Sequence, residues 1–206
     1  KNSRILIKLS GESLMGTGNY GISIDTVNNI ATNLKKLLFK KTEICVVIGG
    51  GNIFRGLEAS SQGMDRANAD YMGMLATVLN GLALQNALEK IDTQTRVMSA
   101  FPIQSICETY IRRRAIRHME KGRIVICAAG TGNPYFSTDT AAALRAAELD
   151  CNVIYKATQV DGIYDKDPKK FKNAKKYKDI SYKKFLNDNL KVMDSSAITV
   201  AQDNNI

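Results

Sequence analysis

The sequence of 206 residues lacks several features by which common catalytic sites are recognised. It has no tryptophan, a single histidine (His118), and four cysteines (Cys45, Cys107, Cys127 and Cys151) without a Cys-x-x-Cys pair. A zinc site, a disulfide framework and a nucleophile activated by histidine are therefore not expected. Reduced thiols that pack as small hydrophobic side chains, and a cytoplasmic location, are expected instead.

Long apolar segments are missing too. No run approaches the roughly 18 residues of a membrane span, and the sequence begins directly with a strand pattern, so we expect neither a membrane helix nor a signal peptide. Hydrophobic residues make up 44% and charged residues 24%, an ordinary globular balance. The length suits one α/β domain or two small ones.

The net charge of +9 is concentrated in one segment. Residues 166–184 contain nine lysines against two aspartates, which leaves +7 there, and the rest of the chain is nearly neutral. We interpret this segment as a loop whose lysines face water and raise the local concentration of anionic substrates. It lacks the aromatic platform and the arginines typical of RNA binding, so nucleic acid is not an expected partner.

Strand and helix patterns alternate along the chain. Strands are predicted at 4–9, 45–48, 96–100, 123–128 and 152–156, and helices at 25–38 (with Asp25 as N-cap), 68–90, 108–121, 141–148 and from about 194. Residues 58–63 are predicted to form a mobile loop. The alternation predicts the α/β class, a three-layer αβα sandwich with a mostly parallel central sheet.

Glycine-rich or lysine-bearing turns follow four of these strands. Lys8 lies near the end of the first strand, Gly49-Gly50-Gly51 with Arg55 follow the second, and residues 130–139 and 157–168 follow the last two. Carboxyl ends of parallel strands meet at one edge of a sheet, so these turns should converge. Glycine amides, a lysine and an arginine suit an oligophosphate. Thr138 or Asp139 should also cap the following helix, and Asp70 should lie in the first turn of its helix, where the dipole favours a carboxylate.

The turns match neither Gly-x-x-x-x-Gly-Lys-[Ser/Thr] nor Gly-x-Gly-x-x-Gly with its acidic partner, so a P-loop or dinucleotide fold is not expected. No histidine lies in a turn to act as general base. A phosphate acceptor needs none, because its oxygens are already ionised near neutral pH. The residues present therefore favour phosphoryl transfer between two phosphates, which depends on positioning and positive charge.

Five segments together resemble the bacterial uridylate (UMP) kinases, which have the amino-acid-kinase fold. In chain order they are KLSGE (8–12), GGGNIFRG (49–56), ADYMGMLAT (69–77), GTGNPYFSTD (130–139) and KATQVDGIY (156–164). They span nearly the whole chain and are more specific together than any one alone. The resemblance implies reversible transfer of the γ-phosphoryl group of ATP to UMP, giving UDP and ADP in pyrimidine nucleotide synthesis, with Mg²⁺ as cofactor.

The family's binding residues carry over by motif. The resemblance implies that ATP is bound by Lys8, Leu9, Ser10, Gly11, Gly51, Arg55, Thr158, Tyr164 and Asp167. It implies that UMP is bound by Gly50, Asp70, Thr131, Gly132, Asn133, Pro134, Tyr135, Phe136, Ser137 and Thr138, with Asp70 on the ribose. Catalytic roles fall to Lys8, Arg55, Asp139 and Asp194: Lys8 would be the main transition-state cation, and the two aspartates would orient it or the metal. Mg²⁺ is expected to be held through the nucleotide phosphates.

The resemblance further implies a homohexamer that GTP activates and UTP inhibits, with the GTP response tied to Gly16, Thr17, Gly18, Asn19, Tyr20 and Gly21. Residues 1–206 would form one domain, with 1–150 mainly binding UMP and 151–206 mainly binding ATP. We expect the family's C-terminal strands to be missing from this chain.

Two other readings stay open. One is another kinase of the same fold, acting on carbamate, acetylglutamate or aspartate, although residues 69–77 and 130–134 match the nucleotide-accepting branch. The other is a nucleotide-sensing, RNA-binding regulator that uses the lysine segment.

Overall fold

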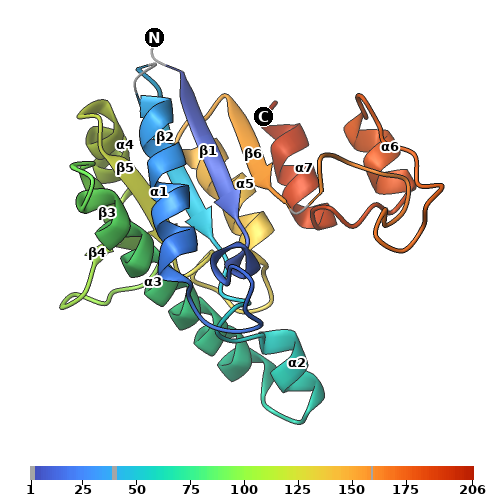
Figure 1. The fold of residues 1–206 in the computed structure, drawn as a ribbon, viewed down its shortest axis with the longest axis horizontal. Coiled ribbons are helices and arrows are strands. Elements are labelled where there is room, and N and C mark those ends of the chain that lie inside the picture. The colour runs from blue at the N-terminus through green and yellow to red at the C-terminus, as the bar shows by residue number, and fades with distance from the viewer. Residues whose placement is uncertain (1–2, 39–40, 159) are drawn as a thin grey trace.

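A single sheet organises the protein, whose computed structural model describes residues 3–38, 41–158 and 160–206. Within these residues six strands lie in the order β4-β3-β5-β2-β1-β6 (Figure 1). Every pairing is parallel, as the alternation predicted. The strands are β1 Arg4–Leu9, β2 Glu43–Ile48, β3 Thr95–Ser99, β4 Glu108–Thr109, β5 Ile124–Ala128 and β6 Val153–Ala157.

Helices cover both faces of the sheet, so the α/β sandwich is confirmed. The helices are α1 Ile24–Leu38, α2 Gly56–Ser61, α3 Arg66–Glu89, α4 Arg112–Glu120, α5 Thr138–Glu148, α6 Tyr182–Asn187 and α7 Ser195–Asp203, and the 3-10 turn η1 is Gly11–Leu14. Figure 1 shows α1 and α3 in front of the sheet and α5 behind it. The segment between β6 and α7, which contains α6, extends beyond the β6 edge.

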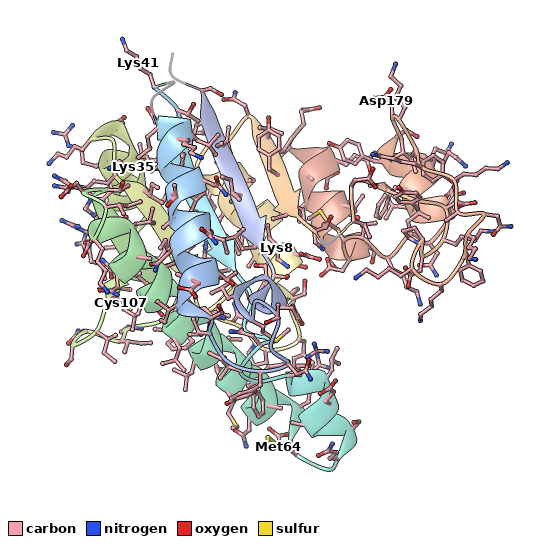
Figure 2. All side chains as sticks on the ribbon, in the orientation of Figure 1. Lys8, Lys35, Lys41, Met64, Cys107 and Asp179 are labelled. Carbon is pink, nitrogen blue, oxygen red and sulfur yellow. The ribbon has the colours of Figure 1, made fainter. Side chains whose placement is uncertain are left out.

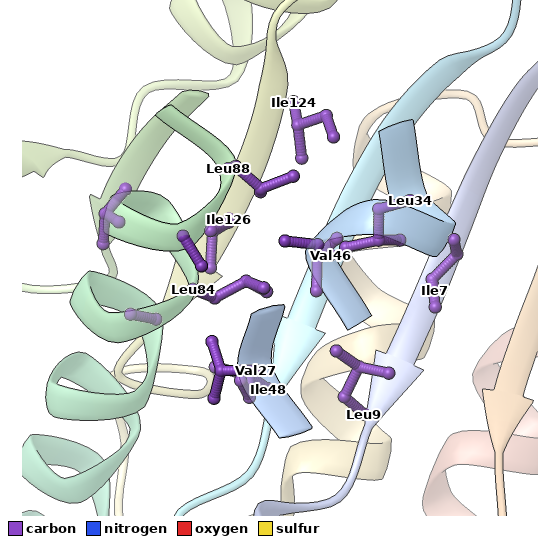
Figure 3. Packing of buried hydrophobic residues seen from close by; sticks show 14 of the residues in the cluster. Ile7, Leu9, Val27, Leu34, Val46, Ile48, Leu84, Leu88, Ile124 and Ile126 are labelled. Carbon is purple, nitrogen blue, oxygen red and sulfur yellow. The ribbon is translucent and has the colours of Figure 1, made fainter. Parts of the chain in front are cut away.

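Each strand divides its side chains between two cores because successive residues point to opposite faces. In β1, Ile5, Ile7 and Leu9 belong to the core that is shared with α1 and α3. Figure 3 shows Ile7 and Leu9 in this core together with Leu34 of α1 and Leu84 of α3. Leu6 points to the opposite core, under α4 and α5. Each such side chain, when fully buried, stabilises the fold by about 1.5–3 kcal/mol.

The cysteines behave as predicted where they fall in strands. Cys45 in β2 and Cys127 in β5 are buried in the core under α5, with their Sγ atoms 3.7 Å apart. Burial raises the pKa of the Cys151 thiol to about 12. All four thiols are free in the structure.

Several predicted boundaries are wrong. Most of the predicted loop 58–63 lies in α2, because Leu57, Glu58 and Ala59 are good helix formers despite their small, polar neighbours. The helix predicted from residue 108 begins at Arg112, because residues 108 and 109 pair with β3 as the short strand β4.

Two predicted helix starts are also wrong. Asp25 does not cap α1: the helix begins at Ile24, and the Thr26 amide donates to Ser23 Oγ at 3.4 Å. α3 begins at Arg66 with Asp65 as its N-cap, so Asp70 lies in the second turn. A helix dipole acts mainly within the first turn, so it does not account for Asp70.

Candidate active site

The loops after β1, β2 and β5 meet at the carboxyl edge of the sheet. A Cβ on Gly49 would lie 2.9 Å from the Gly11 amide nitrogen and 3.5 Å from Thr138 Oγ1. A Cβ on Gly11 would lie 2.6 Å from the Gly51 nitrogen. Real Cβ atoms do not come within 3.0 Å of a backbone atom, so glycine is required where the backbones of the loops after β1 and β2 touch, whereas the 3.5 Å distance to Thr138 Oγ1 is an ordinary contact.

Lys8 and Lys156 share one carboxylate at this edge. Lys8 is the fifth residue of β1 and pairs in register with Lys156 of β6, so both side chains leave the same face of the sheet. Lys8 Nζ lies 2.9 Å from Asp139 Oδ1, and Lys156 Nζ lies 2.7 Å from Oδ2. Figure 2 shows Lys8 at the end of β1. Two ammonium groups facing one carboxylate leave one net positive charge, held where water has little access, since Lys8 is 6% exposed.

Sequence reasoning missed Lys156 as a site residue. The available signal was its position, because it is a lysine close to the carboxyl end of a predicted parallel strand, as Lys8 is. Lys156 also donates a hydrogen bond to the Val192 carbonyl, which ties β6 to the segment before α7.

Asp139 and Asp194 occupy different environments. α5 is capped by Ser137, whose Oγ accepts from the amides of Asp139 and Thr140 at 3.0 and 3.1 Å, so the prediction of Thr138 or Asp139 as cap is wrong. Asp194 caps α7 by accepting from the Ala197 amide at 2.8 Å. It also accepts from Thr140 Oγ1 at 3.0 Å and from Ser137 Oγ. Asp194 therefore joins the starts of α5 and α7, and Asp139 is the carboxylate beside Lys8.

A cavity of about 150 Å³ lies between α3 and the loop after β5. It brings together five of the predicted UMP-binding residues, namely Gly50, Asp70, Phe136, Ser137 and Thr138, with Phe54, Gly56, Gly73, Met74, Thr77 and Gly130. The remaining predicted residues, Thr131, Gly132, Asn133, Pro134 and Tyr135, continue the same loop outside the lining.

Asp70 holds this loop to α3. Its Oδ2 accepts from Arg66 Nε at 2.8 Å and from the Tyr135 amide at 2.7 Å. Tyr135 has a left-handed backbone with φ +72°, and the Arg66 guanidinium lies 5.6 Å from its ring centre. Oδ1 of Asp70 faces Gly56, where a Cβ would come within 2.9 Å. Arg66 is a second residue that sequence reasoning missed.

The Arg55 side chain joins the loop after β1 to the loop after β2. Its guanidinium pairs with Glu12 at 3.0 Å and donates to the Gly51 carbonyl at 3.2 Å. The side chain is 49% exposed, and it does not line the 150 Å³ cavity. This contact lies next to the residues that join β1 to η1, namely Leu9, Ser10 and Gly11.

Thr158, Tyr164 and Asp167 lie in the segment beyond β6. Thr158 lines a cavity of about 550 Å³, and the other two line a cavity of about 530 Å³; both cavities contact Val160, Gly162 and Val192. Tyr164 Oη donates to Asp161 Oδ1 at 2.6 Å, and Lys176 Nζ donates to Oδ2 at 2.8 Å. The hydrogen bonds from Lys176 and then Tyr164 lower the pKa of Asp161 to about 2.

The glycine-rich stretch 16–21 lies against the loop after β2. The Gly21 amide donates to the Asn52 carbonyl at 2.8 Å, and Asn52 Nδ2 donates to the Gly21 carbonyl, also at 2.8 Å. Tyr20 is 74% exposed. In the described parts of the chain, no helix combines the length and apolar character that crossing a membrane requires.

Known proteins resemble this chain over its whole length. A sequence profile of the amino acid kinase family matches residues 3–206. A uridylate kinase of Ehrlichia ruminantium is 58% identical over 207 positions, covering 100% of this chain and 85% of the relative. One from Rickettsia bellii is 56% identical, covering 100% and 86%.

Solved structures agree. The crystal structure of UMP kinase from Ureaplasma parvum superposes with a TM-score of 0.94 at 42% identity, covering 100% of this chain and 88% of that one. An aspartate kinase from Synechocystis, at 18% identity and a TM-score of 0.75, shares the fold over 99% of this chain and 37% of its own. The chain therefore belongs to the amino acid kinase family, within the branch of the uridylate kinases that its motifs resemble.

Proposed function

We propose that this protein is a uridylate kinase that transfers the γ-phosphoryl group of ATP to UMP. The observation that carries the proposal is the Lys8–Asp139–Lys156 cluster. Its carboxylate, Asp139, directly follows Thr138, which lines the 150 Å³ cavity. The five sequence motifs and relatives at 56–58% identity support the same substrate.

The chemistry needs positive charge more than acid–base catalysis. A UMP phosphate oxygen, already ionised, forms a bond to the γ-phosphorus while the bond from that phosphorus to the bridging oxygen of ADP breaks. Charge develops on the transferred oxygens and on the leaving oxygen. The excess positive charge shared by Lys8 and Lys156 would stabilise it, and Asp139 fixes both ammonium groups before substrate arrives.

The binding roles are part of the proposal. UMP would occupy the 150 Å³ cavity, with Gly50 and residues 131–138 around it and Asp70 Oδ1 free to accept a ribose hydroxyl. ATP phosphates would follow residues 8–11, Gly51 and Arg55, and adenosine would lie against Thr158, Tyr164 and Asp167. On this arrangement residues 1–150 mainly bind UMP and residues 151–206 mainly bind ATP, within one domain.

Magnesium fits as an ion carried by the nucleotide. Among the described residues no three His, Cys, Asp or Glu side chains gather to hold a metal. Mg²⁺ is commonly held by substrate phosphates with one or two carboxylates. Asp139 is the carboxylate beside the proposed phosphate site, and its two oxygens face lysine ammonium groups at 2.9 and 2.7 Å, so the ion would be held mainly through the nucleotide phosphates. When bound, Mg²⁺ would neutralise phosphate charge.

The proposal extends to regulation and assembly. It includes a homohexamer, activation by GTP through residues 16–21 and inhibition by UTP. The hydrogen bonds between Gly21 and Asn52 support the GTP part, because they join this stretch to the phosphate loop. It also includes a cytoplasmic location, which suits four cysteines that are thiols.

A coupled assay of ADP release tests the function. With ATP and Mg²⁺, we expect turnover with UMP, much less with CMP, and none with carbamate, acetylglutamate or aspartate. Lys8→Met serves as a control for contaminating kinases. Turnover of one of the small acids without UMP would replace our proposal with another kinase of the fold. Tight, salt-sensitive RNA binding without any turnover would favour a regulator instead.

A further inference from the structure

Two buried polar side chains on α3 hold the two glycine loops through hydrogen bonds within the protein. Thr77 also lines the 150 Å³ cavity, but its hydroxyl is bonded to protein groups. Thr77 is 1% exposed and Asn80 is 0% exposed. They lie three residues apart, so they are neighbours on the helix surface. Burying a polar group costs free energy unless it is hydrogen-bonded, and apolar residues would have packed here without that cost.

Thr77 fixes the start of the loop after β5. Its Oγ1 donates to the Met74 carbonyl at 2.7 Å and accepts from the Ala129 amide at 2.7 Å. Ala129 is buried and has a left-handed backbone with φ +60°, followed by Gly130 at φ +56°. Alanine seldom adopts this conformation, so it persists only where surrounding contacts impose it.

Asn80 fixes the loop after β2. Its Nδ2 donates to the Gly49 carbonyl and to Asn52 Oδ1, each at 2.7 Å. Its Oδ1 accepts from Asn52 Nδ2 at 3.0 Å, and the same nitrogen donates to the Gly21 carbonyl. The two amides therefore bond reciprocally and join α3, the triple-glycine turn and the stretch 16–21.

We propose that Thr77 and Asn80 are positioning residues that set the distance and angle between the acceptor loop, 129–138, and the phosphate loop, 49–56. The inference rests on the proposed function, since those loops are assigned to UMP and to the junction of the two nucleotides. α3 contacts both, so it acts as the rigid spacer between them. A small displacement of either loop would misalign an in-line transfer.

The test compares variants that keep shape but remove one hydrogen-bonding group. Thr77→Val should raise KM for UMP about tenfold with a smaller change in KM for ATP, because it loosens the UMP loop. Asn80→Leu should lower kcat about 10- to 100-fold, because it loosens the loop where the nucleotides meet. Thr77→Ser retains the hydroxyl and should behave like the wild type.

Hydrogen exchange without substrates tests positioning independently of activity. Thr77→Val should speed amide exchange in peptides covering 129–135, and Asn80→Leu in peptides covering 49–54, each leaving the other loop nearly unchanged. Leu84→Ala is the matched control: it is 1% exposed, one turn further along α3, and packs only in the hydrophobic core. It should lower the melting temperature at least as much, with kinetic constants close to the wild type.

Equal kinetic losses in Leu84→Ala and in the two test variants would overturn the proposal, since general destabilisation would then suffice. Unchanged exchange in both loops would overturn it as well. If Asn80→Leu does not fold, Thr77→Val decides, because valine keeps the shape of threonine. If the wild type does not phosphorylate UMP, the proposed function fails, yet the exchange experiment still tests positioning.

Discussion

Lysine–aspartate ion pairs occur both at the carboxyl ends of the strands and in the segment beyond β6, and they differ in how far water reaches them. At the strand ends, the side chains of Lys8 and Asp139 are 7% and 14% exposed. Beyond β6, those of Lys176 and Asp161 are 44% and 73% exposed. Water screens the second pair and not the first, so only the first can present a fixed charge to a substrate.

The supporting contacts explain the difference. Asp139 lies in the first turn of a capped helix, and both lysines leave paired parallel strands. The segment beyond β6 relies on local contacts, such as the isolated bridge between Tyr164 and Lys176 and the six-residue α6. Rigid preorganisation thus lies where the reacting phosphates are proposed to meet, and a more adaptable surface lies where the nucleoside of ATP is proposed to bind.

Replacing Lys8 should have the largest effect on kcat, because it removes one member of the buried ion pair. Lys8→Met should lower kcat about 10³-fold, because it removes fixed charge from a site shielded from water. Folding should survive, since Asp139 keeps Lys156 as its partner. Steady-state kinetics and thermal unfolding measure both effects, and Lys176→Met is the exposed control, with kcat expected near the wild type. A kcat for Lys8→Met within fivefold of the wild type would contradict the role of Lys8.

Replacing Lys156 should have the next largest effect. Lys156→Met should lower kcat about 10²-fold, because the cluster loses its excess positive charge while Lys8 remains. Lys156 also donates to Val192, so loosening of the segment after β6 should raise KM for ATP. Lys184→Met removes a lysine that is paired on the surface with Asp188 and should leave both constants unchanged. An effect confined to KM would show that Lys156 only anchors the segment.

Replacing Asp70 should affect KM for one nucleotide more than KM for the other. Asp70→Ala should raise KM for UMP about tenfold and change KM for ATP little, since it removes the proposed ribose acceptor and the anchor of Tyr135. Initial rates with each substrate varied in turn measure the two constants. Asp65→Ala, which removes the cap of α3, is a control for helix destabilisation. Equal increases in both KM values would remove Asp70 from the UMP site.

Asp161 should give the smallest effect. Asp161→Asn weakens the tether of Tyr164 and should raise KM for ATP about twofold, as expected for an exposed interaction. The pKa of Asp161 is lowered to about 2, below its unfolded value, so the charged tether is complete above about pH 4 and is lost only as pH falls through 2. The ratio of variant to wild-type KM should therefore stay constant from pH 8 to pH 5. A ratio that falls toward one at pH 5 would show that Asp161 titrates there.

Much of the fold could be predicted because it depends on local patterns. Apolar runs such as 45–48, separated by helix patterns, are enough to indicate parallel strands whose ends meet at one edge. Lys8 could be singled out because it is a lysine near the end of such a run. β4 could not be predicted: two residues carry no periodicity, and only their pairing with β3 makes them a strand.

The network behind the site could not be predicted for a different reason. Asn80 and Thr77 lie within an apolar helix pattern, and nothing nearby in the sequence indicates that their partners are Gly49 and Ala129. Lys156 is separated from its register partner Lys8 by 148 positions, so their shared carboxylate follows only from the strand order β1-β6. Local patterns place chemical groups at an edge, whereas long-range packing decides which of them touch.

The register of β6 against β1 also limits how this chain can change by insertion or deletion. Neighbouring residues of a strand point to opposite faces, so a one-residue slip of β6 would turn Lys156 away from Asp139 and bring its neighbour into that place. Losing or gaining a single codon within either strand should thus abolish turnover even where the sheet still forms, whereas length changes in residues 172–174, which line neither cavity beyond β6, should be tolerated.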